Sequence, residues 1–313
     1  MSSKALTFAI FGNLYQQEKS VAIKQVLTCL KNHGARIIVD EEYYQFLIGI
    51  PGVQEIFGIP ETPSNPQSPE IPECSRFTTF TNDNFEADFV ISMGGDGTLL
   101  KTASRVGNKQ IPILGVNMGR LGFLADLSAD TFPETIEALH RGDYSVEDRA
   151  LIRVETNGEP IEGCECALND VSILKRDSAS MIAIRANING EYLTTYQADG
   201  LIISTPTGST AYSLSNGGPI IVPRTGVFLM TAVAPHSLNV RPIVLPDTAQ
   251  IELTVTSRSH TFLVAIDGRS GKLPEGTTLR LSRAPYTVKV VKRSSTRYFS
   301  TLREKMMWGA DLR

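Results

Sequence analysis

The stretch VISMGGDGTLL, residues 90–100, is the part of the sequence where an apolar strand passes into a helix through a glycine turn. Residues 90–93 are apolar enough for a buried strand, the glycines at 94–97 interrupt it, and residues 98–100 have the composition of a first helical turn. A strand, a glycine turn and a helix in this order direct backbone N–H groups at a phosphate. The turn nevertheless carries the carboxylate of Asp96, whose charge would repel a phosphate, so the motif has to be explained together with this residue.

The spacing of the glycines excludes two common phosphate-binding loops. No stretch matches the Walker A pattern G-x-x-x-x-G-K-[ST]. The Rossmann pattern G-x-G-x-x-G fails because Gly95 and Gly97 would need a glycine at position 100, which is Leu. These residues alone leave two interpretations: a tight connection in which Asp96 caps the helix, or a ligand-binding turn of another class.

The sequence around this turn predicts an α/β domain over residues 1–147. Apolar runs typical of strands alternate with helical patterns, which favours a Rossmann-like parallel sheet with helices on its faces. The expected strands are 6–11, 35–39, 89–93 and 111–116, and the expected helices are 20–33, 99–106 and 133–140. Segment 58–76 interrupts the pattern with a proline at every third position, which favours an exposed insertion loop or, alternatively, a lid or partner-docking segment.

A second, β-rich and sandwich-like domain is predicted over residues 148–296. Short alternating runs are separated there by turn signals such as Asn189-Gly190 and Asp267-Gly268. The expected strands are 151–155, 167–174, 181–188, 201–204, 227–233, 251–256, 262–266 and 286–291. The tail, about 297–313, has a helical pattern and is expected to pack back on the first domain.

Composition excludes several classes of protein. The 313 residues carry a formal net charge of −3 without a basic stripe, so no nucleic-acid partner is expected. The apolar run at 6–11 is too short for a signal peptide or a membrane span, so we expect no membrane partner and a cytoplasmic location. Four cysteines suit a reducing compartment. Cys164 and Cys166 lack a second pair at zinc spacing, and no metal-ligating residue is predicted.

Three other stretches carry candidate functional residues. NMGRLGFLADL, residues 117–127, follows the next strand and should reach the same sheet edge as the glycine turn; its Phe123 either stacks on a base or fills the core. Residues 197–220 are rich in hydroxyls and small side chains, which let a ligand approach the backbone, but they contain no G-x-S-x-G. Asp170 lies among apolar residues, so its carboxylate must be paired, hydrogen-bonded or functional.

Taken together, these stretches resemble the bacterial NAD kinases. The matching segments are GGDGT at 94–98, N-x-G-R-L-G-F-L at 117–124, Asn-Asp at 169–170, DGLIISTPTGSTAYS at 199–213 with GGPI at 217–220, and RPIVL at 241–245. The long stretch from 199 is specific, whereas diacylglycerol kinases, sphingosine kinases and related phosphofructokinases share versions of GGDGT. The resemblance implies a Mg²⁺-dependent kinase that transfers the terminal phosphate of ATP, or of polyphosphate, to the 2′-hydroxyl of the adenosine ribose of NAD.

The resemblance also implies roles for individual residues. Asp96 would be the catalytic base that takes the proton of the ribose 2′-hydroxyl, which accounts for a carboxylate in a phosphate-binding turn. The implied substrate-binding residues are Asp96, Gly97, Lys101, Phe123, Asn169, Asp170, Asp199, Thr210, Ala211, Tyr212, Ser213, Leu214 and Ser215. Asn169 and Asp170 would hold a ribose, Asp199 the carboxamide end, and residues 210–215 the two base pockets, while Lys101 would meet phosphate.

A homo-oligomer, a dimer or a tetramer, is implied as well, because subunits of the family complete each other's NAD sites. Residue 197 is Gln where some relatives place Arg, so the choice between NAD and NADH stays open. Two alternative functions are a lipid kinase that shares the glycine turn and a dinucleotide sensor without turnover. The polar 205–215 stretch and the lack of an amphipathic membrane helix argue against the lipid kinase.

Overall fold

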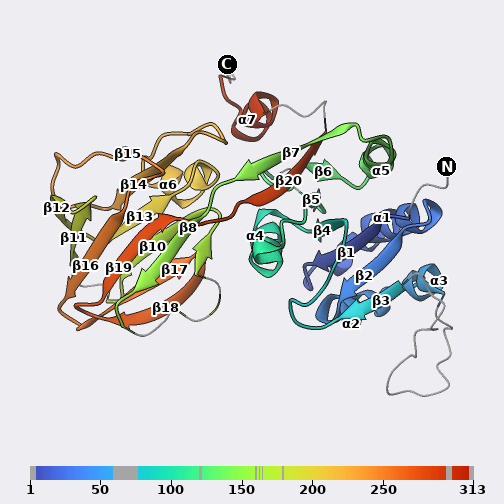
Figure 1. Cartoon of the computed structure of the whole chain (residues 1–313), viewed down its shortest axis with the longest axis horizontal. Helices are drawn as coiled ribbons and strands as arrows, with labels where there is room; N and C mark the ends of the chain where they lie inside the picture. Colours follow the sequence, from blue (N-terminus) through green and yellow to red (C-terminus); the bar gives the residue numbers. More distant parts are fainter. Residues whose placement is uncertain are drawn as a thin grey trace. The chain divides into compact units, whose positions relative to one another are not determined.

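The computed structural model describes residues 5–58, 77–119, 122–158, 161, 163, 165–177, 180–293 and 298–309. The chain divides into two compact units (Figure 1): Met1–Glu147 together with Lys289–Arg313, and Asp148–Val288. Nearly all of the proline-rich segment 58–76, as well as Arg120 and Cys164, lies outside the described residues. Each unit has a hydrophobic core of its own.

The described part of the first unit is built on an eight-stranded sheet in the order β3-β2-β1-β4-β5-β20-β7, with β6 paired to β5. Its pairs from β3 to β20 are parallel, as is the β5–β6 pair. The strands are β1 (Thr7–Gly12), β2 (Arg36–Asp40), β3 (Phe77–Phe80), β4 (Phe89–Met93), β5 (Ile113–Asn117), β6 (Leu127–Ser128), β7 (Tyr144–Arg149) and β20 (Val288–Arg293). All five residues of β4 are buried, as expected of a parallel strand covered on both faces.

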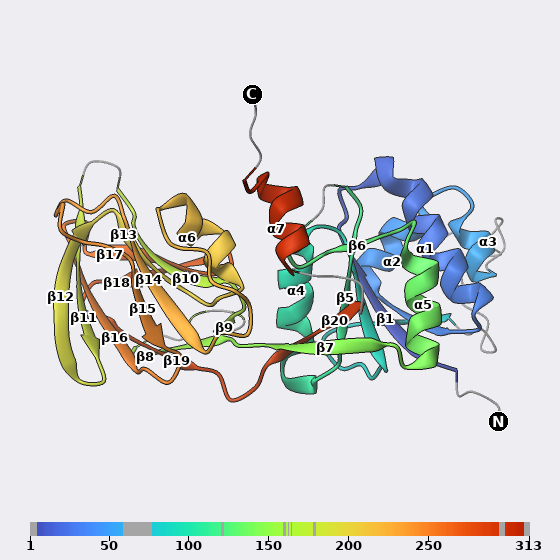
Figure 2. The same ribbon diagram turned by 90° about the horizontal axis from the view of Figure 1, so that it is seen from above.

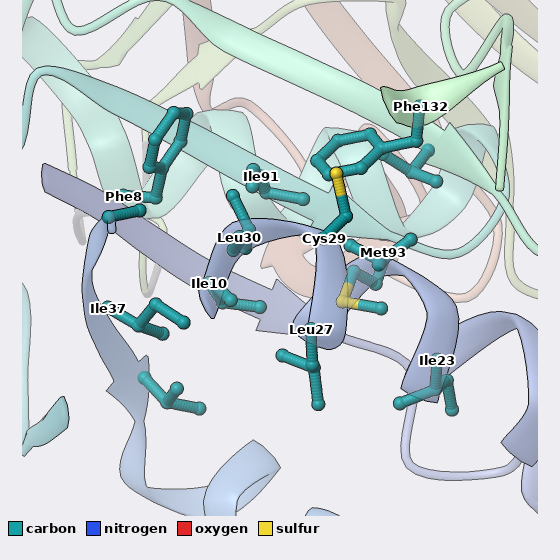
Figure 3. Close-up of a cluster of buried hydrophobic side chains, with 14 of the residues drawn as sticks. Phe8, Ile10, Ile23, Leu27, Cys29, Leu30, Ile37, Ile91, Met93 and Phe132 are labelled. Atoms are coloured by element: carbon teal, nitrogen blue, oxygen red, sulfur yellow. The ribbon is translucent and has the colours of Figure 1, made fainter. Parts of the chain in front are cut away.

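Helices cover this sheet through apolar faces. They are α1 (Ser20–Asn32), α2 (Glu41–Ile48), α3 (Val53–Phe57), α4 (Asp96–Val106) and α5 (Phe132–Arg141). Two short 3-10 turns, η1 (Gln17–Lys19) and η2 (Gly107–Lys109), and the helix α7 (Tyr298–Met306), which follows β20 in the chain, complete the unit. Leu27 and Leu30 of α1 pack on Ile10 and Ile91 of the sheet (Figure 3). Burying each such side chain stabilises the fold by about 1.5–3 kcal/mol. Gly34, with a φ of +68°, takes the left-handed conformation that ends α1.

The second unit consists of two antiparallel sheets whose facing sides share one core. In the described residues one sheet has the order β15-β14-β13-β10-β17-β18 and the other β12-β11-β16-β19-β8-β9. The strands are β8 (Ile152–Thr156), β9 (Cys166–Ala167), β10 (Asp170–Lys175), β11 (Ile182–Ile188), β12 (Glu191–Ala198), β13 (Gly200–Ser204), β14 (Val227–Val233), β15 (Ile243–Pro246), β16 (Ile251–Ser257), β17 (Thr261–Ile266), β18 (Arg269–Pro274) and β19 (Thr278–Arg283). A 3-10 turn, η3 (Gly208–Thr210), and a short helix, α6 (Tyr212–Ser215), follow β13.

The predicted fold class, an α/β unit followed by a β-rich unit, is confirmed. One strand is placed differently from the expectation, because β20 pairs in parallel with β5 although residues 286–291 were assigned to the β-rich part. A short apolar run has the same appearance in a buried parallel strand and in a sandwich strand, so periodicity does not separate the two. The expected helix 99–106 begins three residues earlier, at Asp96. Within the described residues, no helix is both long and apolar enough to cross a membrane.

The sheet order places the glycine turn at a topological switch point. The strands β2 and β3, which follow β1 in the chain, lie on one side of β1 in the sheet, whereas β4 and β5 lie on its other side. The switch point is therefore between β1 and β4. The backbone N–H of Asn13, after β1, donates to the carbonyl of Met93 at the end of β4 (3.1 Å). Open α/β sheets bind ligands at the carboxyl ends of the strands that flank such a point. A cavity of about 460 Å³ lies instead at the amino ends, beside Thr7, Arg36 and Asp88.

Candidate active site

The turn after β4 leaves the first turn of α4 open to an anion. The N–H of Gly94 donates to the carbonyl of Val116 (2.9 Å), which ties the turn to the neighbouring strand β5. No side-chain oxygen of the described residues caps α4, whose N-cap is Gly95. A Cβ built on Gly95 or Gly97 meets nothing within 4 Å. Uncapped N–H groups and an unobstructed surface at a helix N-terminus are the features of a phosphate-binding site.

The carboxylate of Asp96 points toward the loop after β5 and not toward its own helix. It accepts the backbone N–H groups of Phe123 (2.9 Å), Leu124 (3.0 Å) and Ala125 (2.9 Å). The helix-capping interpretation of Asp96 therefore does not describe this structure. Three charge-assisted hydrogen bonds hold the carboxylate in one position beside the open turn.

The same loop is anchored at its other end by a buried ion pair. Oδ2 of Asp126 lies 2.5 Å from Nζ of Lys292 on β20. The side chain of Asp126 is 5% exposed and that of Lys292 is 10% exposed. Removing one partner of such a pair leaves a buried charge without compensation and is strongly destabilising. β20, the last strand along the chain, thus fixes the loop that holds Asp96.

A lysine from the C-terminal helix reaches Asp96, and the sequence did not predict it. Nζ of Lys305 on α7 lies 3.4 Å from Oδ2 of Asp96 and 4.5 Å from the ring centroid of Phe123. The lysine that was predicted, Lys101, is exposed on α4. Five residues along a helix correspond to a rotation of about 140°, so Lys101 and Asp96 lie on different sides of α4.

Leu168 and Asn169 form a break between the strands β9 and β10 of the second unit, and Asp170 is the first residue of β10. The expected strand 167–174 is divided into β9, which ends at Ala167, and β10, which begins at Asp170. The carboxylate of Asp267 accepts the N–H groups of Leu168 (2.7 Å), Asn169 (2.8 Å) and Asp170 (3.2 Å). Asp267 is therefore a positioning residue for this break, although its sequence signal was only that of a turn.

Burial is the largest influence on the pKa of each of the two carboxylates, Asp170 and Asp267. Burial, together with the nearby charge of Asp267, raises the pKa of Asp170 to about 7. Burial also raises the pKa of Asp267. The three N–H groups that donate to Asp267 and the charge of Arg269 favour the charged form and lower the pKa, but burial is the larger effect. The Oδ1 atom of Asn169 is buried without a hydrogen-bond partner among the described residues. An unpaired buried acceptor is costly, so a ligand that donates to Asn169 would be favoured.

The hydroxyl-rich segment packs directly on this break. Thr205 donates its backbone N–H to the Asn169 carbonyl (2.9 Å) and its hydroxyl to the Leu168 carbonyl (2.6 Å). A Cβ built on Gly208 would lie 2.1 Å from the backbone carbonyl oxygen of Asn169, so only glycine permits this close approach of the two backbones. The structure therefore joins the break before β10 to the segment that begins at Thr205.

The predicted residues at 210–215 are not equally accessible. Tyr212 and Ser215 are exposed, and Thr210, Ala211 and Leu214 are half-buried. Ser213 is buried, and its hydroxyl forms a hydrogen bond with that of Thr231 (2.9 Å). Ser213 thus ties α6 to β14 through Thr231, whereas the side chain of Tyr212 is open to solvent.

Asp199 lies away from Asn169 and Asp170 within one chain. It precedes β13 and forms an ion pair with Lys175 (2.7 Å), at the opposite end of β10 from Asp170. Asp170 and Lys175 are five residue steps apart along the strand, which corresponds to about 17 Å. The structure does not bring these carboxylates of one chain together.

Comparisons with known proteins agree on one family. Residues 8–144 match the model of the ATP-NAD kinase N-terminal domain, and residues 168–293 match that of the ATP-NAD kinase C-terminal domain. The chain is 53% identical to a curated NAD kinase of Bacteroides fragilis, over 98% of this chain and 100% of the relative. It is 42% identical to a curated NAD kinase of Porphyromonas gingivalis, over 97% and 99%.

Two solved structures share the fold. The yeast NADH kinase complexed with NADH aligns with a TM-score of 0.81 at 24% identity, covering 100% of this chain and 90% of that one. An NAD kinase from Archaeoglobus fulgidus in complex with ATP aligns with a TM-score of 0.70 at 22% identity, covering 96% and 99%.

The α/β unit, its carboxylate-bearing glycine turn and the β-rich unit thus define a phosphotransferase of the nucleotide kinase type. The chain belongs to the NAD kinase family. The resemblance stated from the sequence motifs is confirmed, and the lipid-kinase and sensor alternatives are not favoured.

Proposed function

We propose that this chain transfers the terminal phosphate of ATP to the 2′-hydroxyl of the adenosine ribose of NAD, which gives NADP and ADP. The family and the full-length relatives named NAD kinase support a kinase that acts on NAD. The structural observation that carries the proposal is the carboxylate of Asp96, fixed by three N–H groups beside the open N-terminus of α4. Inorganic polyphosphate is a second donor that the same turn would accommodate.

The proposed reaction needs one proton acceptor and a cradle for phosphate. The 2′-oxygen forms a bond to the terminal phosphorus, the bridging P–O bond breaks, and ADP leaves. Asp96 accepts the proton of the 2′-hydroxyl, while the first N–H groups of α4, including that of Gly97, bind phosphate oxygens. Positioning and charge stabilisation account for most of the catalysis of phosphoryl transfer, so a rigidly held base suits the reaction.

Mg²⁺ is the proposed metal, and the site fits an ion held mainly by the donor. Mg²⁺ retains several waters and is usually bound through one or two carboxylates together with substrate phosphates. The part of the chain that the structure describes contains no group of three or more His, Cys, Asp or Glu placed to hold a metal ion. Asp96 is the carboxylate beside the phosphate cradle and would contribute to holding the ion. When bound, Mg²⁺ neutralises charge on the donor phosphates.

The second unit would hold NAD. Asn169 and Asp170 are proposed to bind a ribose, because an unpaired acceptor and a carboxyl group with a raised pKa both form hydrogen bonds with hydroxyls. Tyr212, flanked by Thr210, Ala211, Leu214 and Ser215, is proposed to line the base pockets, with Ser213 in support. In the first unit, Phe123 is proposed to contact the substrate and Lys101 to lie at the outer edge of the donor phosphates.

Asp199 is proposed to meet the carboxamide end of an NAD molecule held by another copy of the chain. Its separation from Asp170 supports this arrangement, because the two carboxylates lie at opposite ends of β10. The active form would then be a homo-oligomer, a dimer or a tetramer, and we propose a cytoplasmic location.

A single coupled assay tests the function. The purified protein is incubated with NAD, ATP and Mg²⁺, and NADP is measured with a strictly NADP-dependent dehydrogenase. We expect NADP to form, and we expect little phosphorylation of AMP and none of sphingosine or diacylglycerol. Comparable turnover of a lipid, or nucleotide binding without turnover, would replace the proposal with one of the two alternatives.

A further inference from the structure

Lys305 brings a positive charge to the mouth of the glycine turn from a distant part of the chain. The contact joins Nζ of Lys305 on α7 to Oδ2 of Asp96 at the start of α4 at 3.4 Å, across 209 positions of sequence. In the view from above, α7 is drawn over the end of α4 (Figure 2). The ammonium also lies 4.5 Å from the ring centroid of Phe123. A cation over an aromatic face is attracted by the ring, which limits the positions that the flexible lysine stem can take.

The contact contributes little to stability. The side chains of Lys305 and Asp96 are 32% and 28% exposed, and ion pairs with this access to solvent usually add little to the stability of a protein. Asp96 is already held by three backbone N–H groups without it. The geometry is therefore better explained by the charge that Lys305 brings to the turn than by the stability of the pair.

Three other basic side chains among the described residues near the glycine turn either pair with other carboxylates or lie on another side of α4 from Asp96. Arg105 on α4 pairs with Asp40 and Asp83, and Lys292 pairs with Asp126. Lys101 lies on another side of α4 from Asp96. Lys305 thus supplies a positive charge beside the turn where phosphate would bind.

We propose that Lys305 binds the terminal phosphates of the donor and exchanges its contact with Asp96 for them. This inference rests on the proposed function, because it concerns the same phosphate site. The ammonium is a compact charge on a four-carbon stem, so it can move from a carboxylate oxygen to a phosphate oxygen bound at the same helix end. The exchange neutralises donor charge and leaves Asp96 free to accept the proton of the 2′-hydroxyl.

The test compares three variants. Lys305→Met removes the charge and keeps an apolar stem of similar length, Lys305→Arg keeps the charge, and Arg303→Met removes an exposed charge from the same helix. We expect Lys305→Met to raise the KM for ATP roughly tenfold or more, as the loss of a charge-assisted hydrogen bond does, and to lower kcat. The KM for NAD should stay unchanged, Lys305→Arg should restore part of the loss, and Arg303→Met should behave as the parent protein.

Calorimetry separates this role from a structural one. Lys305→Met should weaken the binding of ATP and leave the binding of AMP unchanged, because the lysine contacts only the distal phosphates, and its melting temperature should match that of the parent. Equal losses for ATP and AMP, an unchanged affinity for ATP, or the same loss in Arg303→Met would overturn the inference. Because binding is measured without turnover, a protein that binds ATP through Lys305 but makes no NADP would contradict the proposed function and not this inference.

Discussion

Gly122 lies directly against the carboxylate of Asp96. A Cβ built on Gly122 would come within 2.0 Å of Oδ1 of Asp96, far inside any allowed contact. The bare backbone at this position is what allows Oδ1 to reach the N–H groups of Leu124 and Ala125. A residue with no functional group of its own thus determines where the proposed base lies.

Gly122→Ala should therefore displace Asp96 without removing it. We expect kcat to fall by about 10²-fold, the cost of misplacing a reacting group by about 1 Å. Steady-state kinetics measure the effect, and circular dichroism shows that the variant is folded. Gly119→Ala is the matched control, because a Cβ there meets nothing within 4 Å. Equal activity in the two alanine variants would mean that the Asp96 position does not limit the reaction.

Asp96→Asn tests the base directly. The amide keeps the size of the side chain and loses the ability to take a proton, so kcat should fall by about 10²- to 10⁴-fold with little change in NAD affinity. The affinity is measured by calorimetry. Asp130→Asn, at an exposed carboxylate before α5, should be as active as the parent protein. Normal turnover of Asp96→Asn would refute the assignment of the base.

Asp170 should make the stability of the protein depend on pH. Its pKa is raised to about 7 in the folded protein, whereas an unfolded Asp titrates near 3.9. Between these values the folded state binds a proton that the unfolded state has lost, so the free energy of unfolding falls as pH rises from about 4 to about 7. The slope from this group is at most about 1.4 kcal/mol per pH unit.

Asp170→Asn should remove that part of the slope and make the protein relatively more stable near pH 8 than near pH 5. Urea unfolding at several pH values measures the difference between the variant and the parent, in which the other titrating groups cancel. Asp130→Asn is again the control. Parallel curves for Asp170→Asn and the parent would show that the buried carboxyl does not change its protonation on unfolding.

Sharing of the NAD site between copies can be tested by complementation. Asp96→Asn and Asp199→Asn should each be nearly inactive alone. In co-expressed hybrids, an intact Asp96 on one copy and an intact Asp199 on the other would form complete sites, about a quarter of all sites for random pairing in a symmetric dimer. Activity that stays at the level of the single variants would place both residues of a working site in one chain.

Local motifs in the sequence were sufficient to predict Asp96, Asn169 and Asp170 as candidates. The glycine turn and the apolar surroundings of Asp170 are visible in a few consecutive residues, and the alternation of strands and helices predicted the fold class. Lys305 and Asp267 were missed because their contacts join segments about one hundred or more positions apart. Such pairings depend on the order of strands in the sheets, which local composition does not encode.

Lys101 stays a prediction, and its position differs from the one that its place in the sequence suggested. It was chosen because it follows Asp96 closely in sequence, whereas the rotation of a helix carries it to another side of α4. The strand at 286–291 was assigned to the β-rich part because its apolar run suits either kind of sheet. The rotation of a helix decides the first of these positions, and the order of strands in the sheet decides the second.

The first unit is discontinuous in the chain, and this has a consequence for its synthesis. A ribosome produces Asp96 and the glycine turn early, then the whole of Asp148–Val288, and only afterwards β20 and α7. The second unit, a continuous segment, emerges complete before the first sheet receives β20 and before Asp126 receives its lysine partner. Because domains generally fold as units during synthesis, we expect the β-rich unit to mature first and the phosphate site last. A nascent chain that stalls inside the second unit would carry the proposed base and the glycine turn without β20 and Lys305, so we expect premature products of translation not to consume ATP.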